Sequence, residues 1–437
     1  MIGIGATGRS VVRYLVPQVK DLCVFDKHPD SEAVSALVME FPEVRTAFGD
    51  IDWAYINAAQ YIIMSPGVCP YDPMWQDHHR QKMMSDIELF AHAVSAPVIA
   101  ITGSNGKSTV AALVAHTLKK LGYAVALGGN FGPPALDLLS QDKLDYVVLE
   151  LSSFQLALTS SLRPQVATVL NYSPDHLDWH RDMADYLQAK QRIFSGAQHV
   201  VVNREAPETY SHLNPTVISC GFGSQEPQHP EDFGLRIIDG ACTVVQGDKP
   251  LIKQSALEAP LTFQLLNHLA VFAVLDCLRI PAASYLPAVG GFEALAHRCA
   301  YVGHYDGRDW YNDSKATNSA AMLAAVSGLA TRYPHIILLA GGVWKEKDTM
   351  VFPTPLARHI QCVILFGRDA KILYTMWHEQ HDCVMVKDLR AAVAYAATIS
   401  AEQAAVILSP ACASFDQFSH YQQRGTSFVD IVKNGTV

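Results

Sequence analysis

The chain has 437 residues, of which 49% are hydrophobic and 17% charged, and its formal net charge is −9. This length exceeds what one hydrophobic core usually supports, so we expect three domains. The negative charge is spread along the chain without a basic cluster, which argues against a nucleic-acid surface and favours small-molecule partners.

The nine cysteines are scattered and never spaced as Cys-x-x-Cys, so the sequence indicates neither a disulfide framework nor a cysteine zinc site. No apolar run approaches membrane-spanning length, and Met1 leads into a glycine-rich turn instead of a signal sequence. We therefore expect a cytoplasmic protein without membrane insertion. A monomer is the default expectation for its oligomeric state.

The chain opens on a glycine-rich motif. Gly3-Ile4-Gly5-Ala6-Thr7-Gly8 matches Gly-x-Gly-x-x-Gly, and the apolar run at 22–25 ends in Asp26, the spacing of a dinucleotide-binding fold. Only two residues precede Gly3, so the first strand is short or the true start lies upstream. Taken alone, this segment predicts a Rossmann-like domain that binds a nicotinamide. A strand is predicted at 61–64 and a helix at 85–94. We place the end of this first domain at residue 86.

A second glycine-rich turn lies at 102–109, Thr-Gly-Ser-Asn-Gly-Lys-Ser-Thr, between an apolar run and an alanine-rich helix. Backbone N–H groups freed by Gly103 and Gly106 can point at phosphate oxygens, Lys107 can neutralise them, and Ser108 can ligate magnesium. The usual spacing would need glycine at position 101, which is isoleucine, so this is a variant of the loop. It predicts nucleoside triphosphate binding, and a turn that only caps a helix is the alternative.

Downstream, strands and helices alternate. Continuous apolar runs at 97–101, 146–149, 166–170 and 199–202 predict a parallel sheet covered on both faces. A small β excursion within 207–254 and a helix at 267–278 complete a central mononucleotide-binding α/β domain at 87–294. Strands at 310–311, 335–339, 361–366 and 405–408 then describe a third α/β unit at 295–437.

Polar residues follow these predicted strands. Glu150 ends one strand, where a carboxylate can reach a magnesium ion on the loop, with a structural salt bridge as the alternative. Ser173 and Pro174 predict a helix start, which places His176 in its first turn. His176 and His180 are four residues apart, so zinc is conceivable, but no third ligand is near. A histidine linked to magnesium beside the phosphates is favoured over zinc and over a helix-capping histidine.

Lys190 lies on a predicted amphipathic helix, where the default is a solvated surface lysine. Its protonated amine has no lone pair for a metal ion. Lys190 can therefore serve a cation site only if it is chemically modified, or by pairing with phosphate.

The third unit begins with a polar cluster, His297-Arg298 and residues 312–318. Arg298 and Lys315 can stabilise charge on a transferring phosphoryl group. Three further residues, Thr317, Lys345 and Ser414, can clamp a small carboxylate. Surface networks of these charges are the alternative.

Together these motifs resemble the Mur ligase family nearly end to end, and that family uses the variant loop. The matching segments are the Gly-x-Gly-x-Thr-Gly opening, 101–109, 149–155, Asp175-His176, Ala189-Lys190, His297-Arg298, 312–318 and 408–418. The resemblance implies three α/β domains: a Rossmann-like N-terminal domain, a central P-loop mononucleotide-binding domain and a C-terminal Rossmann-like domain. It is strongest to the member that adds D-glutamate to UDP-N-acetylmuramoyl-L-alanine through an acyl phosphate, in peptidoglycan precursor synthesis.

The resemblance also implies site residues. Those for the UDP-linked substrate are Ala6, Thr7, Asp26, Lys27, Ser65 and Gly67, with Asn130 and His176 near its carboxylate. Those for ATP are Gly103, Asn105, Gly106, Lys107, Ser108, Thr109, Asn267, Arg298 and Asp313. Two Mg²⁺ ions are implied on Ser108, Glu150, His176 and a carbamylated Lys190. Those for D-glutamate are Thr317, Lys345, Ser414 and Tyr421. The implied catalytic set is Lys107, Glu150, His176, Lys190, Arg298 and Lys315.

The chain departs from the family pattern in three places. Only Asn267 remains of the adenine-side His-Asn-x-x-Asn, Tyr421 stands where phenylalanine is usual, and His28 replaces an arginine. No base for the ammonium group of D-glutamate is evident. The alternatives are a nicotinamide dehydrogenase, a regulatory protein with an idle nucleotide loop, and a Mur ligase that adds another amino acid.

Overall fold

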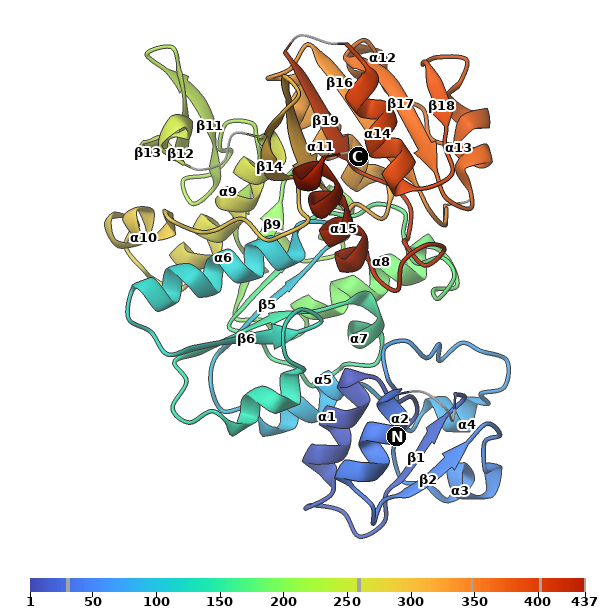
Figure 1. Ribbon diagram of the computed structural model, residues 1–437. Coiled ribbons are helices and arrows are strands. Elements are labelled where there is room, and N and C mark those ends of the chain that lie inside the picture. The colour runs from blue at the N-terminus through green and yellow to red at the C-terminus, as the bar shows by residue number, and fades with distance from the viewer. Residues whose placement is uncertain (29–31, 258–260, 347–348, 401–402, 436–437) are drawn as a thin grey trace. The chain divides into compact units, whose positions relative to one another are not determined.

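The computed structural model describes residues 1–28, 32–257, 261–346, 349–400 and 403–435 (Figure 1). The chain forms two compact units. The first comprises Met1–Tyr172, Leu177–Lys253 and Asn267–Gly291, and the second comprises Ser173–His176, Gln254–Leu266 and Phe292–Val437. No helix in the described ranges is long and apolar enough to span a membrane.

The N-terminal part of the first unit is built around the first glycine-rich turn. Its strands are β1 (Cys23–Asp26), β2 (Arg45–Phe48), β3 (Ile62–Ile63) and β4 (Met83–Met84). Its helices are α1 (Ala6–Leu15), α2 (Glu32–Glu40), α3 (Trp53–Ala58), α4 (Asp77–Arg80) and α5 (Asp86–Ala93). Ile2 forms single parallel bridges to Phe25 and Met64, so a bridge stands in place of a full first strand.

A nine-stranded sheet carries the rest of the first unit, in the order β13-β12-β11-β10-β9-β8-β5-β7-β6. Its strands are β5 (Val98–Thr102), β6 (Val125–Gly129), β7 (Tyr146–Glu150), β8 (Val166–Val169), β9 (His199–Asn203), β10 (Ile218–Phe222), β11 (Phe233–Ile238), β12 (Ala241–Gln246) and β13 (Lys249–Lys253). β5 lies between β7 and β8, and all three are buried and parallel. The predicted buried parallel strands are confirmed, and the β excursion is the antiparallel edge β11-β12-β13.

Five helices accompany this sheet: α6 (Lys107–Lys120), α7 (Ser153–Ala157), α8 (Met183–Gln191), α9 (Thr262–Cys277) and α10 (Ala282–Val289). Short 3₁₀ turns lie at Ala135–Ser140, Arg192–Phe194, Pro207–Thr209, Pro215–Val217 and Gln254–Ala256. The predicted helix start at Ser173 and Pro174 is wrong, because α8 begins only at Met183. His176 has a left-handed φ of +57°, which interrupts a helix, and Asp182 provides the N-cap by accepting from the backbone N of Asp185.

The second unit contains a six-stranded sheet in the order β14-β15-β19-β16-β17-β18, parallel except for the edge strand β14. Its strands are β14 (Ala300–Tyr305), β15 (Arg308–Asn312), β16 (His335–Gly341), β17 (Ile360–Phe366), β18 (Cys383–Met385) and β19 (Ala404–Leu408). Its helices are α11 (Ser319–Ala330), α12 (Thr354–Ala357), α13 (Ala370–Trp377), α14 (Leu389–Thr398) and α15 (Tyr421–Asn434).

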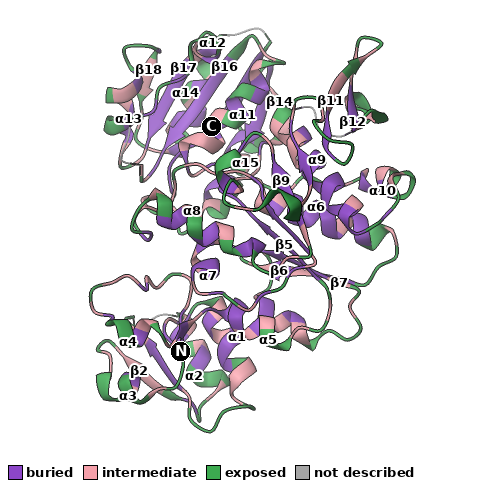
Figure 2. Cartoon of the chain, turned by 180° about the vertical axis from the view of Figure 1, so that it is seen from behind, coloured by how far each residue is buried: buried purple, intermediate pink, exposed green. Residues whose placement is uncertain are grey.

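Alternate residues of β16 enter different cores. Leu338 packs in a cluster with Met322 of α11, and Leu339 packs in another with Phe428 of α15. Figure 2 accordingly shows β16 and β17 as buried strands. Burial on both faces explains the continuous apolar runs of the sequence and confirms the predicted α/β unit.

Candidate active site

The predicted phosphate loop joins β5 to α6. Gly103 and Gly106 have φ of +155° and +83°, a region that favours glycine, and Gly106 is the N-cap of α6. A Cβ on Gly106 would lie 2.7 Å from Oδ1 of Asn267, so the loop packs closely on α9. The loop therefore presents backbone N–H groups at a helix N-terminus, which is the geometry of a phosphate site.

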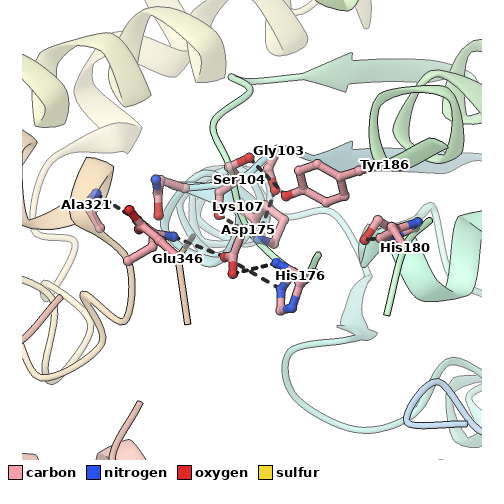
Figure 3. Close-up of polar contacts among 12 residues, drawn as sticks. Gly103, Ser104, Lys107, Asp175, His176, His180, Tyr186, Ala321 and Glu346 are labelled. Atoms are coloured by element: carbon pink, nitrogen blue, oxygen red, sulfur yellow. Dashed lines mark hydrogen bonds and ion pairs between the residues drawn. The ribbon is translucent and has the colours of Figure 1, made fainter. Parts of the chain in front are cut away.

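Lys107 curls over this loop. Its Nζ donates to the carbonyl oxygens of Gly103 at 2.9 Å and Ser104 at 3.1 Å (Figure 3). Asn171, the second residue after β8, also binds this loop: its Oδ1 accepts from Asn105 N at 2.8 Å and its Nδ2 donates to Asn105 O at 2.9 Å. No motif of the sequence marks Asn171, and its place just beyond a strand end is the one signal that points to it.

Three predicted residues meet at the strand ends beside the loop. Ser108 Oγ donates to Oε2 of Glu150, and Asn130 Nδ2 donates to Oε1 of Glu150 at 2.8 Å. Ser108 and Glu150 are buried. A carboxylate and a hydroxyl are the oxygen ligands that Mg²⁺ prefers, so this donor set fits the expected ion. The described residues contain no group of three His, Cys, Asp or Glu side chains arranged to hold a metal.

Lys190 is not a surface lysine. It is only 2% exposed, its Nζ donates to Gly103 O at 2.8 Å, and it lies 4.5 Å from the ring centroid of Tyr186. The default expectation of a solvated side chain is wrong because this face of α8 packs on the phosphate loop. Tyr186 completes the contact, its Oη lying 2.9 Å from Ser104 Oγ (Figure 3).

The two histidines of the predicted helix start have different surroundings. Asp175 accepts from the backbone N of His176 at 2.9 Å and from Asn318 Nδ2 at 3.1 Å, within the second unit. His180 is buried in the first unit, and both of its ring nitrogens have protein partners, Asp185 and Ser153. The ring of His180 is thus committed to hydrogen bonds, which disfavours the zinc alternative.

The residues predicted for the N-terminal site lie at the start of α1 and at or just after the ends of β1 and β3. Asp26 accepts from Ile4 N at 2.6 Å through Oδ2 and from His28 N at 2.9 Å through Oδ1. Gly3 has a φ of +87°, and a Cβ there would lie 2.8 Å from Cβ of Ser65. Ala6 and Thr7 are the first two residues of α1. Lys27 is exposed and directly follows β1, and Gly67 lies two residues after Ser65.

In the second unit, Asp313 is buried just beyond β15. Its Oδ2 accepts from Ser409 Oγ at 2.7 Å and its Oδ1 from Cys299 N at 3.0 Å. Burial raises the pKa of Asp313 to about 7, although these bonds and the neighbouring Arg298 oppose the shift. The carboxyl group can therefore carry a proton near neutral pH.

Most of the other predicted residues follow the carboxyl ends of β15, β16 and β19, whereas Arg298 precedes β14, whose first residue, Ala300, pairs with Asn312 at the end of β15. Lys315 Nζ lies 4.3 Å from the Tyr421 ring centroid, and Lys345 Nζ lies 5.8 Å from that of Phe415. Thr317 and Arg298 are half-buried, Lys345 is exposed and Ser414 is buried. These ends are the ligand side of a parallel α/β sheet.

A buried arginine that the sequence did not single out ties these loops together. Arg424 donates to Ser314 O at 2.8 Å, to Ser314 Oγ at 3.0 Å and to Cys412 O at 3.1 Å. Burial lowers its pKa to about 10. The default expectation for an arginine on a helix is an exposed side chain, so no sequence pattern predicts that Arg424 is buried.

Three family models match successive parts of the chain. They are described as the Mur ligase MurD-like N-terminal domain at residues 1–84, the Mur ligase middle domain at 101–275 and the Mur ligase glutamate ligase domain at 297–412. The phosphate loop lies within the second match and Asp313 within the third.

Relatives match over almost the whole length. A UDP-N-acetylmuramoylalanine--D-glutamate ligase of Pseudomonas syringae pv. syringae is 38% identical over 99% of this chain and 97% of its own. The chain belongs to the Mur ligase family. A family member from Alcanivorax borkumensis with the same name is 39% identical over 98% of this chain and 96% of its own.

Solved Mur ligases share the fold at low identity. UDP-N-acetylmuramate-alanine ligase MurC from Thermotoga maritima has a TM-score of 0.62 at 17% identity, covering 99% of this chain and 98% of its own. MurF ligase from the same organism, solved in complex with ADP, has a TM-score of 0.63 at 16% identity over 99% and 98%. The three-part α/β architecture expected from the sequence is confirmed.

Proposed function

We propose that this Mur ligase joins D-glutamate to UDP-N-acetylmuramoyl-L-alanine at the cost of ATP, in peptidoglycan precursor synthesis. Its relatives carry the name of that activity at 38% identity over nearly full length. The structural observation that carries the proposal is the phosphate loop with Lys107 over it and the buried Glu150 bonded to Ser108. This arrangement suits an enzyme that transfers a phosphoryl group.

In the proposed reaction, the terminal alanine carboxylate attacks the γ-phosphate of ATP and gives an acyl phosphate with release of ADP. The amine of D-glutamate then attacks the acyl carbon, an amide forms, and phosphate leaves. Lys107 and the loop N–H groups stabilise the charge on the phosphoryl group, and Arg298 and Lys315 are proposed to add to it. Holding the three substrates in line contributes much of the remaining acceleration.

We propose two Mg²⁺ ions, which when bound would neutralise phosphate charge. Ser108 and Glu150 supply suitable oxygen donors for one. The amine of Lys190 does not suit a cation, and a carbamate on it would be an anion able to serve, with His176, the second ion. Native mass spectrometry of the protein in bicarbonate buffer tests this, since carbamylation adds the mass of carbon dioxide that Lys190→Met should lack.

The three-part division at 1–86, 87–294 and 295–437 is proposed to follow the three substrates. The turn around Asp26 and Ser65 would hold the UDP-linked substrate, and the loop with Asn267 would hold ATP. Thr317, Lys345, Ser414 and Tyr421 are proposed for D-glutamate. We further propose that the chain acts as a cytoplasmic monomer.

An amino-acid panel tests the function. Phosphate release from ATP is measured with UDP-N-acetylmuramoyl-L-alanine and each of D-glutamate, L-glutamate, L-alanine, L-lysine and meso-diaminopimelate. We expect release only with D-glutamate and only with the UDP-linked substrate present. Release with another amino acid would indicate a different Mur ligase, and no release with any would indicate a regulatory nucleotide-binding protein.

A further inference from the structure

A buried chain of hydrogen bonds runs through His180. Its Nε2 lies 2.9 Å from Ser153 Oγ, and its Nδ1 lies 2.8 Å from Asp185 Oδ2. Ser153, His180 and Asp185 are 2%, 3% and 7% exposed. The second oxygen of Asp185 accepts from Arg181 Nη2 at 2.7 Å. The bridge therefore joins the first residue of α7 to the first turn of α8 across the imidazole.

The partners assign the protons. A carboxylate can only accept, so Nδ1–H of His180 donates to Asp185 and Nε2 accepts from the Ser153 hydroxyl. Burial lowers the pKa of His180, which keeps the ring neutral. Burial opposes ionisation of Asp185, but hydrogen bonds from Arg181, His180 and Tyr71 lower the pKa of that carboxyl below its usual range. A neutral ring between a hydroxyl and an ionised carboxylate is a stable bridge near neutral pH.

Residues that neighbour the bridge in the chain contact the phosphate loop or its proposed metal ligand. On one side, Ser153 follows Glu150 by only three residues. On the other, Tyr186 follows Asp185 directly and reaches Ser104 of the loop (Figure 3). Lys190, four residues further along the same helix, reaches Gly103. His180 thus connects the segment that carries Glu150 to the helix that carries Lys190.

Aromatic packing encloses this bridge. Trp179 stacks on Phe154 with ring centroids 4.5 Å apart, and Tyr71 meets Trp179 edge-on at 5.7 Å. The Ser–His–Asp order is that of a hydrolase triad. The Ser153 hydroxyl is nevertheless buried, so a substrate carbonyl has no access to it. The arrangement fits support of neighbouring groups and not nucleophilic attack.

We propose that His180 is a positioning residue of the ligase reaction: through Ser153 and Asp185 it fixes α8 relative to the Glu150 segment and so holds Tyr186 and Lys190 against the phosphate loop. This inference rests on the proposed function, because its effect is read in the rate of that reaction. Side chains that orient a catalytic group need no contact with substrate to affect the rate.

Kinetics of four single variants and one double variant test this proposal. Ser153→Ala removes the hydrogen bond to Nε2, and His180→Ala removes both hydrogen bonds of the bridge. In His180→Asn the side-chain amide N–H can take the place of Nδ1–H and still donate to Asp185, while the bond to Ser153 is lost. Ser219→Ala is the matched control, since Ser219 Oγ lies 3.3 Å from His199 Nδ1 in the same unit, on β10 and β9. All rates are measured well below each variant's Tm.

We expect Ser153→Ala and His180→Asn to lower kcat about fivefold and His180→Ala about tenfold or more, by the usual worth of one and two hydrogen bonds. The KM for ATP should change little, because the bridge touches no substrate. The double variant Ser153→Ala/His180→Ala should be no slower than His180→Ala, since both changes break the same bridge. Ser219→Ala should keep the wild-type kcat.

Hydrogen exchange supplies a reading independent of turnover. The amides of α8 should exchange faster in His180→Ala than in Ser219→Ala. A wild-type chain without D-glutamate-dependent phosphate release would overturn the proposed function and this inference with it. An active wild type whose Ser153 and His180 variants keep kcat within about twofold, or whose effects simply multiply in the double variant, would overturn the inference alone.

Discussion

Lys107 is the residue on which turnover of ATP should depend most directly. Its ammonium lies over the loop, within 3.1 Å of two loop carbonyl oxygens, where it can exchange them for phosphate oxygens. Lys107→Ala should lower kcat/KM for ATP at least about a hundredfold, as removal of one charge-stabilising group does. Phosphate release under saturating D-glutamate measures this.

Lys119→Ala is the control for Lys107→Ala, because Lys119 is an exposed lysine of the same helix. It should leave kcat/KM unchanged. Robust activity of Lys107→Ala would contradict the assignment of the loop as the phosphate site.

Asp313 predicts a pH dependence of stability. Burial raises its pKa from 3.8 to about 7, so between these values the folded chain holds a proton that the unfolded chain has lost. The unfolded state then binds fewer protons, and this group's contribution to stability falls as pH rises through the window and levels off above about pH 7. The cost can reach on the order of 4 kcal/mol for a fully buried carboxyl group.

Asp313→Asn removes this titration and keeps a similar shape. The free energy of unfolding of the variant minus that of wild type should therefore be larger at about pH 8 than at about pH 5. Urea denaturation at the two pH values measures this difference. An equal difference between variant and wild type at both values would show that Asp313 ionises normally in the folded chain.

At the scale of the element, Gly5 and Gly8 of the first turn differ in the space available for a side chain. A Cβ on Gly8 would lie 2.3 Å from Gly3 O, whereas a Cβ on Gly5 would meet no atom within 4 Å. Gly8→Ala must therefore separate α1 from the turn, and overpacking of this kind costs about 1–3 kcal/mol. We expect a lower Tm for Gly8→Ala than for wild type by thermal denaturation.

Gly5→Ala is the counterpart that should keep the wild-type Tm. Gly5 is the N-cap of α1, at the point where a phosphate would approach the backbone. Its methyl group should weaken binding of the UDP-linked substrate, measured by calorimetry. A Gly5→Ala chain with unchanged affinity would place the diphosphate elsewhere.

Elements differ in how far local sequence determines them. The helix predicted at 85–94 is α5 (Asp86–Ala93), and the Ser85 hydroxyl caps it by accepting from Glu88 N. The segment after β8 shows the opposite case. Ser173 and Pro174 form a good local start signal, yet α8 begins at Met183, where Asp182 caps it and Lys190 and Tyr186 gain contacts with the phosphate loop. A local signal is overridden when another start buries more side chains.

At the scale of the whole molecule, ligand stabilisation separates the rival nucleotide assignments. A ligand that binds only the folded chain stabilises it, by about 2.7 kcal/mol at a hundred times its Kd. ATP with magnesium should therefore raise the Tm. NADH should leave it unchanged, because the N-terminal match is to a Mur ligase domain and not to a dehydrogenase. A Tm raised by NADH and not by ATP would contradict the ligase assignment.

The sequence by itself determined the α/β class, the two glycine-rich turns and the strand–loop–helix arrangement of the residues proposed for phosphate, from Gly103 to Ser108. These features depend on near neighbours: apolar runs, glycines at positive φ, and residues that follow strand ends. It also placed Glu150 at the end of β7, where the structure joins it to Ser108 and Asn130.

Only the tertiary structure decided which polar residues leave the solvent. Lys190, Arg424 and His180 are buried by contacts with residues 87, 110 and 27 positions away, respectively. Local pattern gives a lysine or arginine on a helix an exposed default, because burial of a charge is stable only with partners that the distant chain supplies. The parts of the site that depend on such partners therefore emerge only when the strands and helices are assembled.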